Sequence, residues 1–339
     1  MDEIILISDT DIDFLNDRLR SMMPQHIADA MAYAHVDADV YASGSGYFFK
    51  RQLAHIATRA YQAKVPTPNA FSFFSSDSEI QRGADSYIQY IEEPLGEAII
   101  IANFADDLPR VNVTQREESK SIQWLGAAYG FSVKDIAAAT FANKPLNQTL
   151  GITARKIVER KHNRLAWFGD YEAKLDGILT NADVPRVLFS NQFSAATAAL
   201  TIEDEITAAI NGVRILTKTT ATITDIAFPP AEYAHIHSTS RSTDGNSNTS
   251  IAQYILMNNP SLERIHEAWE LDADENGGTA LMLGWNRDAD SMRYEMVVAF
   301  EQQPAQRNGL EFVVDNLGIT GGMNIPRPLE AFVGVLVRA

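Results

Sequence analysis

The spacing of apolar residues changes along this chain, and the first clear pattern lies between residues 84 and 130. Apolar and polar residues alternate there, for example where polar Asn112 separates Val111 from Val113. A period of two is typical of a β-strand, because successive side chains point to opposite faces. Two prolines in the segment restrict its strands to sheet edges, since proline has no backbone N–H to donate. We therefore expect a projecting β-hairpin over residues 84–130, with an exposed charged tip at residues 116–120.

A helical spacing follows this hairpin. Ser132 and Asp135 resemble a capping box at the start of a short helix that ends at Ala142. Pro145 can begin a longer helix, because proline is tolerated in the first helical turn. Apolar residues then recur at helical spacing: Leu146, Leu150, Ala154, Ile157, Leu165 and Phe168. Basic residues occupy the other side, so we expect one amphipathic helix over residues 145–168 that packs on a sheet and exposes one side to water.

Residues 185–290 are expected to form a separate α/β lobe. Its first helix begins near Thr201 and would bury Ile206, Ile210 and Val213, and a later helix covers 249–257. The strands expected in this lobe and towards the end of the chain are 223–228, 263–271, 279–285, 294–300, 309–314 and 332–337. Because Asn276-Gly277 favours a tight turn, the second and third of these strands are expected to pair as a hairpin.

Composition narrows the classes of function. The chain has 339 residues, of which 45% are apolar and 21% charged, so it can bury a large core. Its formal net charge of −16 argues against a protein that binds nucleic acid by neutralising phosphates. It contains no cysteine, which excludes disulfides, Cys-ligated zinc and thiol catalysis. The acidic N-terminus and the short apolar run near Ala98 predict neither a secretory signal nor a membrane span.

Three segments carry motifs whose order is informative. They are the run 132–181 with its Trp-Phe-Gly-Asp and Leu-Asp-Gly-Ile-Leu-Thr-Asn motifs, the hairpin segment 105–113, and the end of the chain at 309–312, 321–322 and 325–328. Their order and spacing resemble the major capsid proteins of tailed bacteriophages, which share the Hong Kong 97-type fold. Within that group they resemble a family long catalogued only as a domain of unknown function.

The resemblance implies an α+β chain with this capsid fold. Its parts would be an N-terminal arm at 1–70, an extended loop at 84–130, a peripheral domain at 131–184 and 291–339 with the spine helix at about 145–168, and an axial domain at 185–290. The implied function is that of a major capsid protein, which self-assembles into the icosahedral head shell around double-stranded DNA. Such a protein is not an enzyme and needs no cofactor and no metal.

The resemblance also implies partners. They are copies of the chain itself in hexamers and pentamers, a portal protein, scaffolding or decoration proteins, and DNA that is enclosed without sequence-specific binding and without a membrane. The chain would belong to the virion and would assemble in the host cytoplasm. Candidates for inter-subunit contact are the residues of the expected tip, Arg116, Glu117, Glu118 and Lys120. Some relatives join subunits through a Lys–Asn isopeptide bond, for which Lys120 is the candidate lysine, with no asparagine identified.

Two other functions fit parts of the sequence. An encapsulin-like nanocompartment shell resembles the same fold but holds protein cargo. A metal-dependent hydrolase would use His235 and His237, whose alternation on an expected strand places both imidazoles on one face. Residues 272–277 imitate the start of a calcium loop, but Leu283 stands where a bidentate carboxylate is needed, so a turn is the better interpretation.

Overall fold

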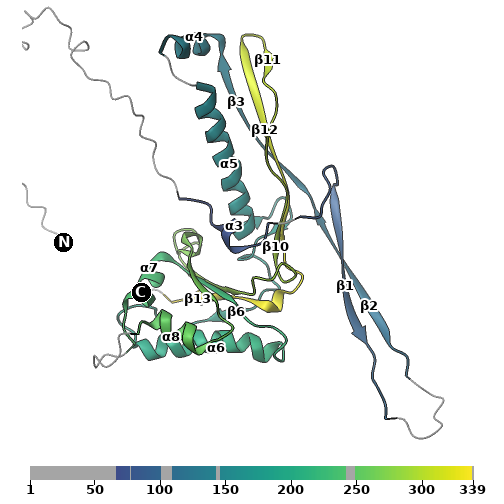
Figure 1. Ribbon diagram of the computed structural model, residues 1–339, viewed down its shortest axis with the longest axis vertical. Helices are drawn as coiled ribbons and strands as arrows, with labels where there is room; N and C mark the ends of the chain where they lie inside the picture. Colours follow the sequence, from purple (N-terminus) through teal and green to yellow (C-terminus); the bar gives the residue numbers. More distant parts are fainter. Residues whose placement is uncertain (1–65, 77, 101–108, 143–145, 242–248, 338–339) are drawn as a thin grey trace, which may run out of the picture. The chain divides into compact units, whose positions relative to one another are not determined.

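The computed structural model describes residues 66–337 except 77, 101–108, 143–145 and 242–248 (Figure 1). The chain divides into two units, Met1–Val65 and Pro66–Ala339, and the described residues all belong to the second. The arm expected at 1–70 therefore lies almost entirely outside the described residues. The second unit mixes helices with antiparallel and parallel strands, so the predicted α+β class is confirmed.

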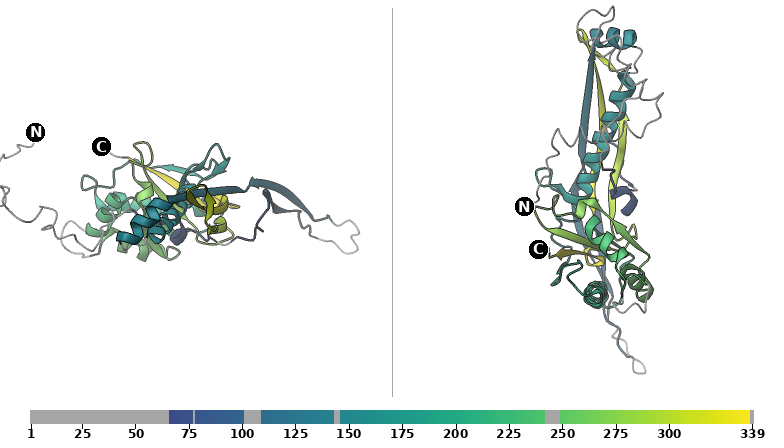
Figure 2. Two further views of the ribbon diagram at one scale, coloured as in Figure 1. Left: turned by 90° about the horizontal axis from the view of Figure 1, so that it is seen from above. Right: turned by 90° about the vertical axis from the view of Figure 1, so that its left-hand side faces the viewer.

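The hairpin consists of β1 (Ser86–Leu95) and β2 (Asn112–Ser121), which pair antiparallel along their whole length. Leu95 lies opposite Asn112, so the chain turns between these two residues. The expected charged tip is wrong, because residues 116–120 lie along β2, opposite 87–91. Charged residues are tolerated at any exposed strand position, so their clustering does not locate a turn. Figures 1 and 2 show the pair extending away from the other strands and helices of this unit.

The strand β3 (Gln123–Ser132) follows β2 directly but belongs to a different sheet. It pairs with the long strand β12 (Glu311–Asn324), which also pairs with β10 (Arg293–Gln302) and β11 (Gln306–Asn308). The short helix α4 (Val133–Ala142) begins where β3 ends. The predicted capping contacts are present, since the Asp135 N–H donates to Ser132 Oγ (3.1 Å) and the Ser132 N–H donates to Asp135 Oδ2 (3.0 Å).

The predicted long helix is observed as α5 (Leu146–Phe168), which packs against β3, β10 and β12. Its buried stripe runs through Ala154, Val158 and Leu165, while its basic residues are exposed, as expected for an amphipathic helix. Ile157 does not lie on the buried face and is about half exposed. The stripe passes through Val158 and His162 instead, because residues four apart lie on the same side of a helix.

The second sheet has the strand order β6-β13-β9-β7-β8. Its strands are β6 (Arg186–Leu188), β7 (Asp225–Phe228), β8 (Arg264–Glu267), β9 (Ala280–Trp285) and β13 (Ala331–Leu336), and its helices are α6 (Ala199–Leu216), α7 (Pro230–Ser238) and α8 (Ile251–Asn258). The hairpin expected from 263–271 and 279–285 is wrong, because β7 lies between β8 and β9. After β8 the chain turns away into the 3-10 helix η1 (Trp269–Leu271) instead of continuing into a tight turn.

Two clusters of buried apolar side chains hold this unit together. The first collects aromatic residues that are far apart in the sequence, among them Phe73, Phe74, Trp167, Trp285 and Tyr294. Phe73 and Phe74 come from the single helical turn α3 (Ala70–Phe73) and the residue after it. The second cluster contains the predicted buried face of α6, Ile206, Ile210 and Val213, which is therefore confirmed. The short elements that complete the unit are β4 (Gly169–Asp170), β5 (Leu175–Asp176) and η2 (Pro328–Glu330).

Two glycines explain the Trp-Phe-Gly-Asp and Leu-Asp-Gly motifs. Gly169 follows α5 with φ of +67°, the left-handed conformation that commonly ends helices and that favours glycine. A Cβ at Gly169 would overlap the carbonyl oxygen of Leu175, and one at Gly177 would overlap the backbone nitrogen of Gly169. The two motifs therefore form a close backbone contact that only residues without a side chain allow.

The buried face of α6 gives a stability prediction with a matched control. Ile206 is fully buried on this helix, whereas Ile215 on the same helix is 77% exposed. Ile206→Ala should lower the free energy of unfolding by about 2–5 kcal/mol, since it removes buried methylenes and leaves a cavity. Ile215→Ala should change it by less than about 0.5 kcal/mol. Denaturant-induced unfolding of the full-length, unassembled chain measures both, and equal losses would contradict the packing of α6.

Candidate inter-subunit surface

One face of the hairpin carries exposed apolar side chains among the polar residues Glu92, Gln115 and Glu117. Ile88 and Tyr90 are two residues apart on β1, so they share a face, and they are 53% and 58% exposed. Pro94 lies opposite Val113 of β2 and extends the same face towards the turn. We call these four residues the apolar hairpin face. Further exposed apolar residues near the turn are Leu95, Ile99, Ile100 and Val111.

This face was not singled out by the sequence pattern, although the signal was present. A strand with one buried face has apolar residues at every second position. In β1, apolar or aromatic residues stand at consecutive positions from Tyr87 to Ile91, interrupted by Gln89. Such a strand carries apolar side chains on both faces, which indicates that its second face also packs against another element or another protein.

The four predicted contact residues lie in different surroundings. Arg116 and Glu118 form an exposed ion pair with each other (2.8 Å), and Glu117 lies across from Tyr90. Lys120 is partly buried at the base of the hairpin, where its Nζ donates to the carbonyl oxygen of Met323 (3.1 Å) and to Asn324 Oδ1 (3.4 Å). Burial lowers the pKa of Lys120, and the nearby carboxylates of Glu118 and Asp176 oppose that shift. The structure thus places Lys120 at the base of the hairpin, apart from the exposed Arg116 and Glu117, while Glu118 is partly buried.

A buried polar cluster surrounds Lys120 at the base of the hairpin. Asn324 Nδ2 donates to Gln89 Oε1 of β1 (2.6 Å) and to Glu295 Oε1 of β10 (3.2 Å). Glu295 is fully buried and also accepts from Arg293 Nε (2.5 Å). Hydrogen bonds therefore tie both hairpin strands to the sheet of β10 and β12, and they fix the direction in which the hairpin leaves that sheet.

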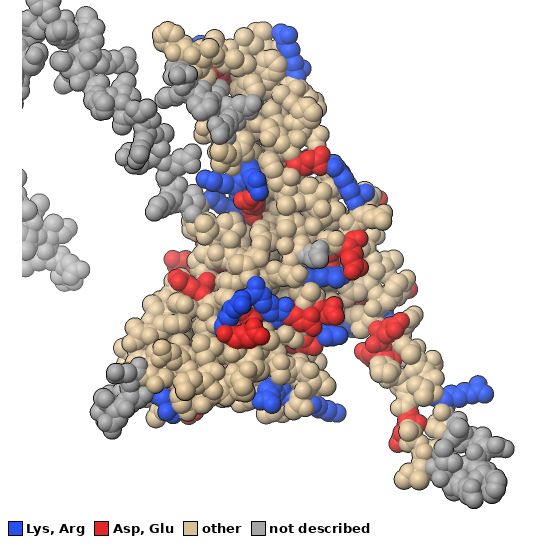
Figure 3. All heavy atoms as spheres, viewed as in Figure 1, with Lys and Arg blue, Asp and Glu red and all other residues tan. Residues whose placement is uncertain are grey.

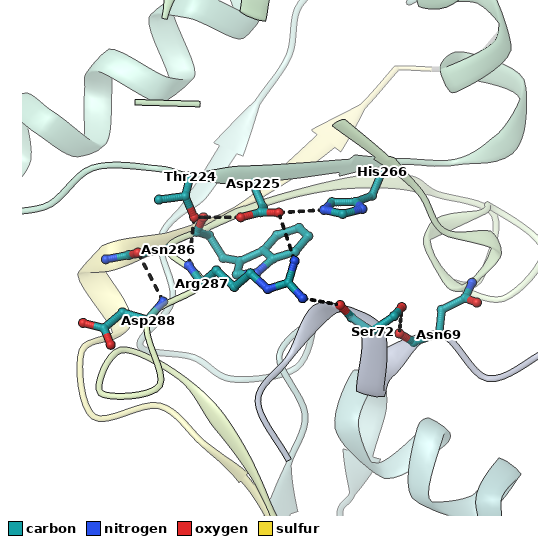
Figure 4. Close-up of polar contacts among 9 residues, drawn as sticks. Asn69, Ser72, Thr224, Asp225, His266, Asn286, Arg287 and Asp288 are labelled. Carbon is teal, nitrogen blue, oxygen red and sulfur yellow. Dashed lines mark hydrogen bonds and ion pairs between the residues drawn. The ribbon is translucent and has the colours of Figure 1, made fainter. Parts of the chain in front are cut away.

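A second polar cluster fixes the first described residues of the unit onto the lobe (Figure 4). Asp225 is fully buried on β7, and its two carboxylate oxygens contact His266 Nε2 (2.6 Å) and Thr224 Oγ1 (2.8 Å). The guanidinium of Arg287 lies 3.9 Å from Asp225 and donates to the carbonyl oxygen of Ser72 (3.0 Å). Burial alone would raise the pKa of Asp225, but hydrogen bonds from His266 and Thr224 and the charge of Arg287 outweigh it and lower that pKa.

The other side of α3 is held by a buried amide and a buried acid. Asn163 Oδ1 accepts from the backbone N–H groups of Asn69 (3.0 Å) and Ala70 (2.9 Å), which satisfies the start of the helical turn. Asn163 Nδ2 donates in turn to Glu270 Oε1 (2.8 Å). Burial raises the pKa of Glu270 above its ordinary range. Together the two clusters fix the position of α3 through hydrogen bonds to Asn69, Ala70 and Ser72.

Exposed apolar residues also lie at both ends of the described unit. At the end formed by α4 and the turn before β12 they are Val133, Ile136, Phe141 and Leu310, and on the lobe they are Leu188, Leu200, Ile215, Leu216 and Met257. A cavity of about 440 Å³ lined by Val187, Leu188, Gly212 and Leu216 opens on the lobe beside α6. On the face drawn in Figure 3, charged side chains stand singly or in small mixed groups and form no continuous basic patch among the described residues.

The hydrolase hypothesis depends on a strand that is not there. His235 and His237 lie on the helix α7, which Pro230 begins directly after β7, so the strand prediction is wrong. Two residues apart on a helix, the imidazoles point in roughly opposite directions. His235 Nδ1 contacts Thr239 Oγ1 (3.2 Å) and His237 Nδ1 contacts the carbonyl oxygen of Tyr233 (3.0 Å). Within the described ranges, no group of three or more His, Asp or Glu side chains is arranged to hold a metal ion.

The calcium-like segment forms turns, as expected, although not the turn of a hairpin. Asn276 Nδ2 donates to the carbonyl oxygens of Glu270 and Asp272 (both 2.8 Å), and Gly277 has a positive φ of +65°. Among the helices that the structure describes, none combines the length and the apolar character that crossing a bilayer requires.

Comparison with known proteins agrees with this geometry. A family model described as major capsid protein matches residues 96–333. The fold is similar to the capsid of Myoviridae phage XM1, with a TM-score of 0.76, 14% identity, and coverage of 86% of this chain and 100% of that one. It is also similar to the capsid of an empty GTA particle (TM-score 0.60, 10% identity, 85% and 97% covered). A virus-like particle from Pyrococcus furiosus follows (TM-score 0.50, 11% identity, 78% and 90% covered). No curated protein matches the chain.

The Asp225 cluster predicts a pH-dependent stability. Because its pKa is lowered in the folded state, ionised Asp225 stabilises the fold above the ordinary carboxyl pKa, and this contribution is lost as pH falls through the lowered value. Asp225→Asn should therefore lower the free energy of unfolding by about 1–3 kcal/mol at neutral pH. The deficit should shrink in strong acid, where the natural side chain is also neutral.

Denaturant unfolding of the full-length chain over a pH series measures this difference. Asp274→Asn changes an exposed carboxylate of the same lobe and should leave stability nearly unchanged at every pH. A deficit for Asp225→Asn that stays constant down to low pH would show that its ionisation plays no part.

Proposed function

The chain belongs to the major capsid protein family, and from this premise we propose that its copies overlap through the β1–β2 hairpin to build an icosahedral phage head around double-stranded DNA. Forming the shell is the role of this family, and shell formation requires self-association. The single observation that carries the proposal is the apolar hairpin face, Ile88, Tyr90, Pro94 and Val113, which is exposed in the isolated subunit.

A hairpin of this kind gains stability by lying on a neighbour. Burying one large apolar side chain contributes about 1.5–3 kcal/mol, and the contact recurs in every copy of a closed shell. Subunits in hexamers and pentamers meet at slightly different angles, so a projecting pair of strands suits contacts that must tolerate such differences. Arg116, Glu117 and the partly buried Glu118 lie on the same hairpin and are the charged contacts that would set its register on the neighbour.

The parts of the fold then have the following roles. Residues 84–130 are the extended loop, 131–184 and 291–339 the peripheral domain with α5 as its spine, and 185–290 the axial domain, preceded by an N-terminal arm at 1–70. The exposed apolar residues of the lobe support an axial role, because axial domains must meet around the centre of each capsomer. Portal, scaffolding and decoration proteins would join the same surfaces, and assembly would take place in the host cytoplasm before the chain becomes part of the virion.

The charge of the chain suits enclosure of DNA without binding to it. The formal net charge of −16 repels phosphates, and the drawn face of the described unit carries no continuous basic patch. The inner surface of a DNA container should not bind the DNA tightly. We assign no substrate turnover to the chain, since its buried polar clusters serve to position α3 and the hairpin.

Replacing exposed apolar residues of the hairpin by lysine tests the overlap directly. The double variant Ile88→Lys, Tyr90→Lys should leave a folded subunit, because both side chains are exposed in it, but should abolish shells, because two ammonium groups cannot be buried on a neighbour. Asn112→Lys with Thr114→Lys places the same charges on the opposite face of the hairpin and should assemble. Negative-stain images and size-exclusion chromatography give the readout, and normal shells from the Ile88/Tyr90 variant would refute the proposed contact.

The contents of the shell test the second part of the proposal. Particles isolated from cells that produce them together with their natural partners should contain double-stranded DNA that is protected from added nuclease. A nanocompartment with the same fold would hold a packaged protein instead. Particles that carry a protein cargo and no protected DNA would therefore contradict a phage head.

A further inference from the structure

A glycine directly follows an asparagine at three positions of the chain. The pairs are Asn211-Gly212, Asn276-Gly277 and Asn308-Gly309. In such a pair the backbone nitrogen of the glycine can attack the side-chain amide carbon of the asparagine, because glycine has no Cβ to block the approach. The attack needs a side-chain amide that can rotate and a glycine N–H that is not committed to another hydrogen bond. The structure places the three pairs in very different surroundings.

Two of the pairs are held in conformations that oppose this attack. Asn211 and Gly212 lie inside the helix α6, where each backbone N–H donates to the carbonyl oxygen four residues earlier. Asn276 Nδ2 donates to the carbonyl oxygens of Glu270 and Asp272 (both 2.8 Å), so both of its amide hydrogens are engaged. The amide of Asn276 therefore has to give up two hydrogen bonds before it can turn towards the nitrogen of Gly277.

The third pair lies at the turn between β11 and β12 and has neither restraint. Asn308 pairs with Glu311, so Gly309 and Leu310 form a two-residue turn, and Gly309 has the positive φ of +63° that suits its first position. Asn308 and Gly309 are both exposed, and the Asn308 side chain makes no hydrogen bond within the described ranges. A side-chain carbon at Gly309 would meet no atom within 4 Å, so a ring that forms there has room.

From these differences we propose that Asn308 is a site of spontaneous deamidation, at which the folded chain gains isoaspartate or aspartate. The nitrogen of Gly309 bonds to Cγ of Asn308, and the bond from Cγ to Nδ2 breaks. The proton of the Gly309 N–H passes through solvent to Nδ2, which leaves as ammonia, so a cyclic imide remains. Water then breaks one of the two bonds from the imide nitrogen to a carbonyl carbon. Breaking the bond to Cγ gives aspartate, and breaking the bond to the backbone carbon gives isoaspartate.

The neighbouring arginine favours the first step. Arg307 Nε donates to the carbonyl oxygen of Gly309 (3.0 Å). A positive charge therefore lies beside the residue whose nitrogen becomes negative as it loses its proton. Neither Asn211 nor Asn276 has an arginine directly before it in the sequence.

The modification would change the end of the unit formed by α4 and the β11–β12 turn (Figure 1). The Val133 N–H donates to the carbonyl oxygen of Leu310 (3.1 Å), which joins this turn to the start of α4. Isoaspartate adds a methylene to the main chain just before the turn, and turn length fixes the register of the two strands. Either product also adds a negative charge near the exposed Leu310. The site lies within one chain, so the inference does not require the shell proposed above.

Peptide mapping of the full-length, unassembled chain after incubation in mildly alkaline buffer tests the proposal. Trypsin releases the three pairs in separate peptides, 187–214, 265–287 and 308–338. In the folded chain, Asn308 should gain the mass that separates Asp from Asn about tenfold or more faster than Asn276, where two hydrogen bonds must break first. In denaturant the three pairs should react at similar rates. Fragmentation assigns the change within each peptide, and methylation by a protein isoaspartyl methyltransferase identifies the isoaspartate.

Two variants serve as a matched pair. Asn308→Gln keeps an amide but lengthens the side chain, so it should abolish the change in peptide 308–338. Asn276→Gln should leave the rate at Asn308 unaltered.

The natural chain alone can overturn the proposal, even where a variant fails to fold. A chain that is folded by circular dichroism and keeps Asn308 intact, while the unfolded chain reacts there, would refute it. Equal rates at Asn308 and Asn276 in the folded chain would refute it as well, because the structure would then not select the site.

Discussion

A two-stranded β-hairpin that projects from its domain has two faces, and no helix or second sheet of the same subunit packs on either of them. In this chain that constraint is acute, because Ile88, Tyr90 and Val113 expose half or more of their surface on a pair of strands that projects from the unit. Isolated hairpins are marginally stable in water, so the exposed face favours any arrangement that covers it. Overlap with another copy is such an arrangement, because burying these apolar side chains on a neighbour stabilises the association of subunits.

The rest of the structure supplies a rigid base for this projection. The aromatic cluster around Trp167 and Trp285 joins α3, α5 and both sheets, and the Asp225 and Asn163 clusters hold α3 from two sides. Close packing makes such a unit resist deformation, so flexing between near-equivalent positions is left to the projecting parts. The cluster of Lys120, Asn324 and Glu295 lies where the rigid base and the projection meet.

Local patterns were enough to predict most helices, while strand pairing was not within their reach. The 3.6-residue period located α5 and α6, since each depends on residues within a few turns. The tip was placed wrongly at 116–120, because a register such as Leu95 opposite Asn112 depends on residues far apart in sequence. For the same reason the pattern could not show that β7 lies between β8 and β9. His235 and His237 alternate as strand residues do, but Pro230 starts a helix, and the apolar hairpin face was visible only as apolar residues at consecutive positions of β1.

The central claim is that the apolar hairpin face becomes buried on another copy of the chain. Cryo-electron microscopy of assembled particles, at a resolution that shows side chains, tests it most directly. We predict density for a neighbouring subunit in contact with Ile88, Tyr90 and Val113 in every hexamer and pentamer. Particles in which these side chains face solvent while the subunits are joined elsewhere would contradict the account.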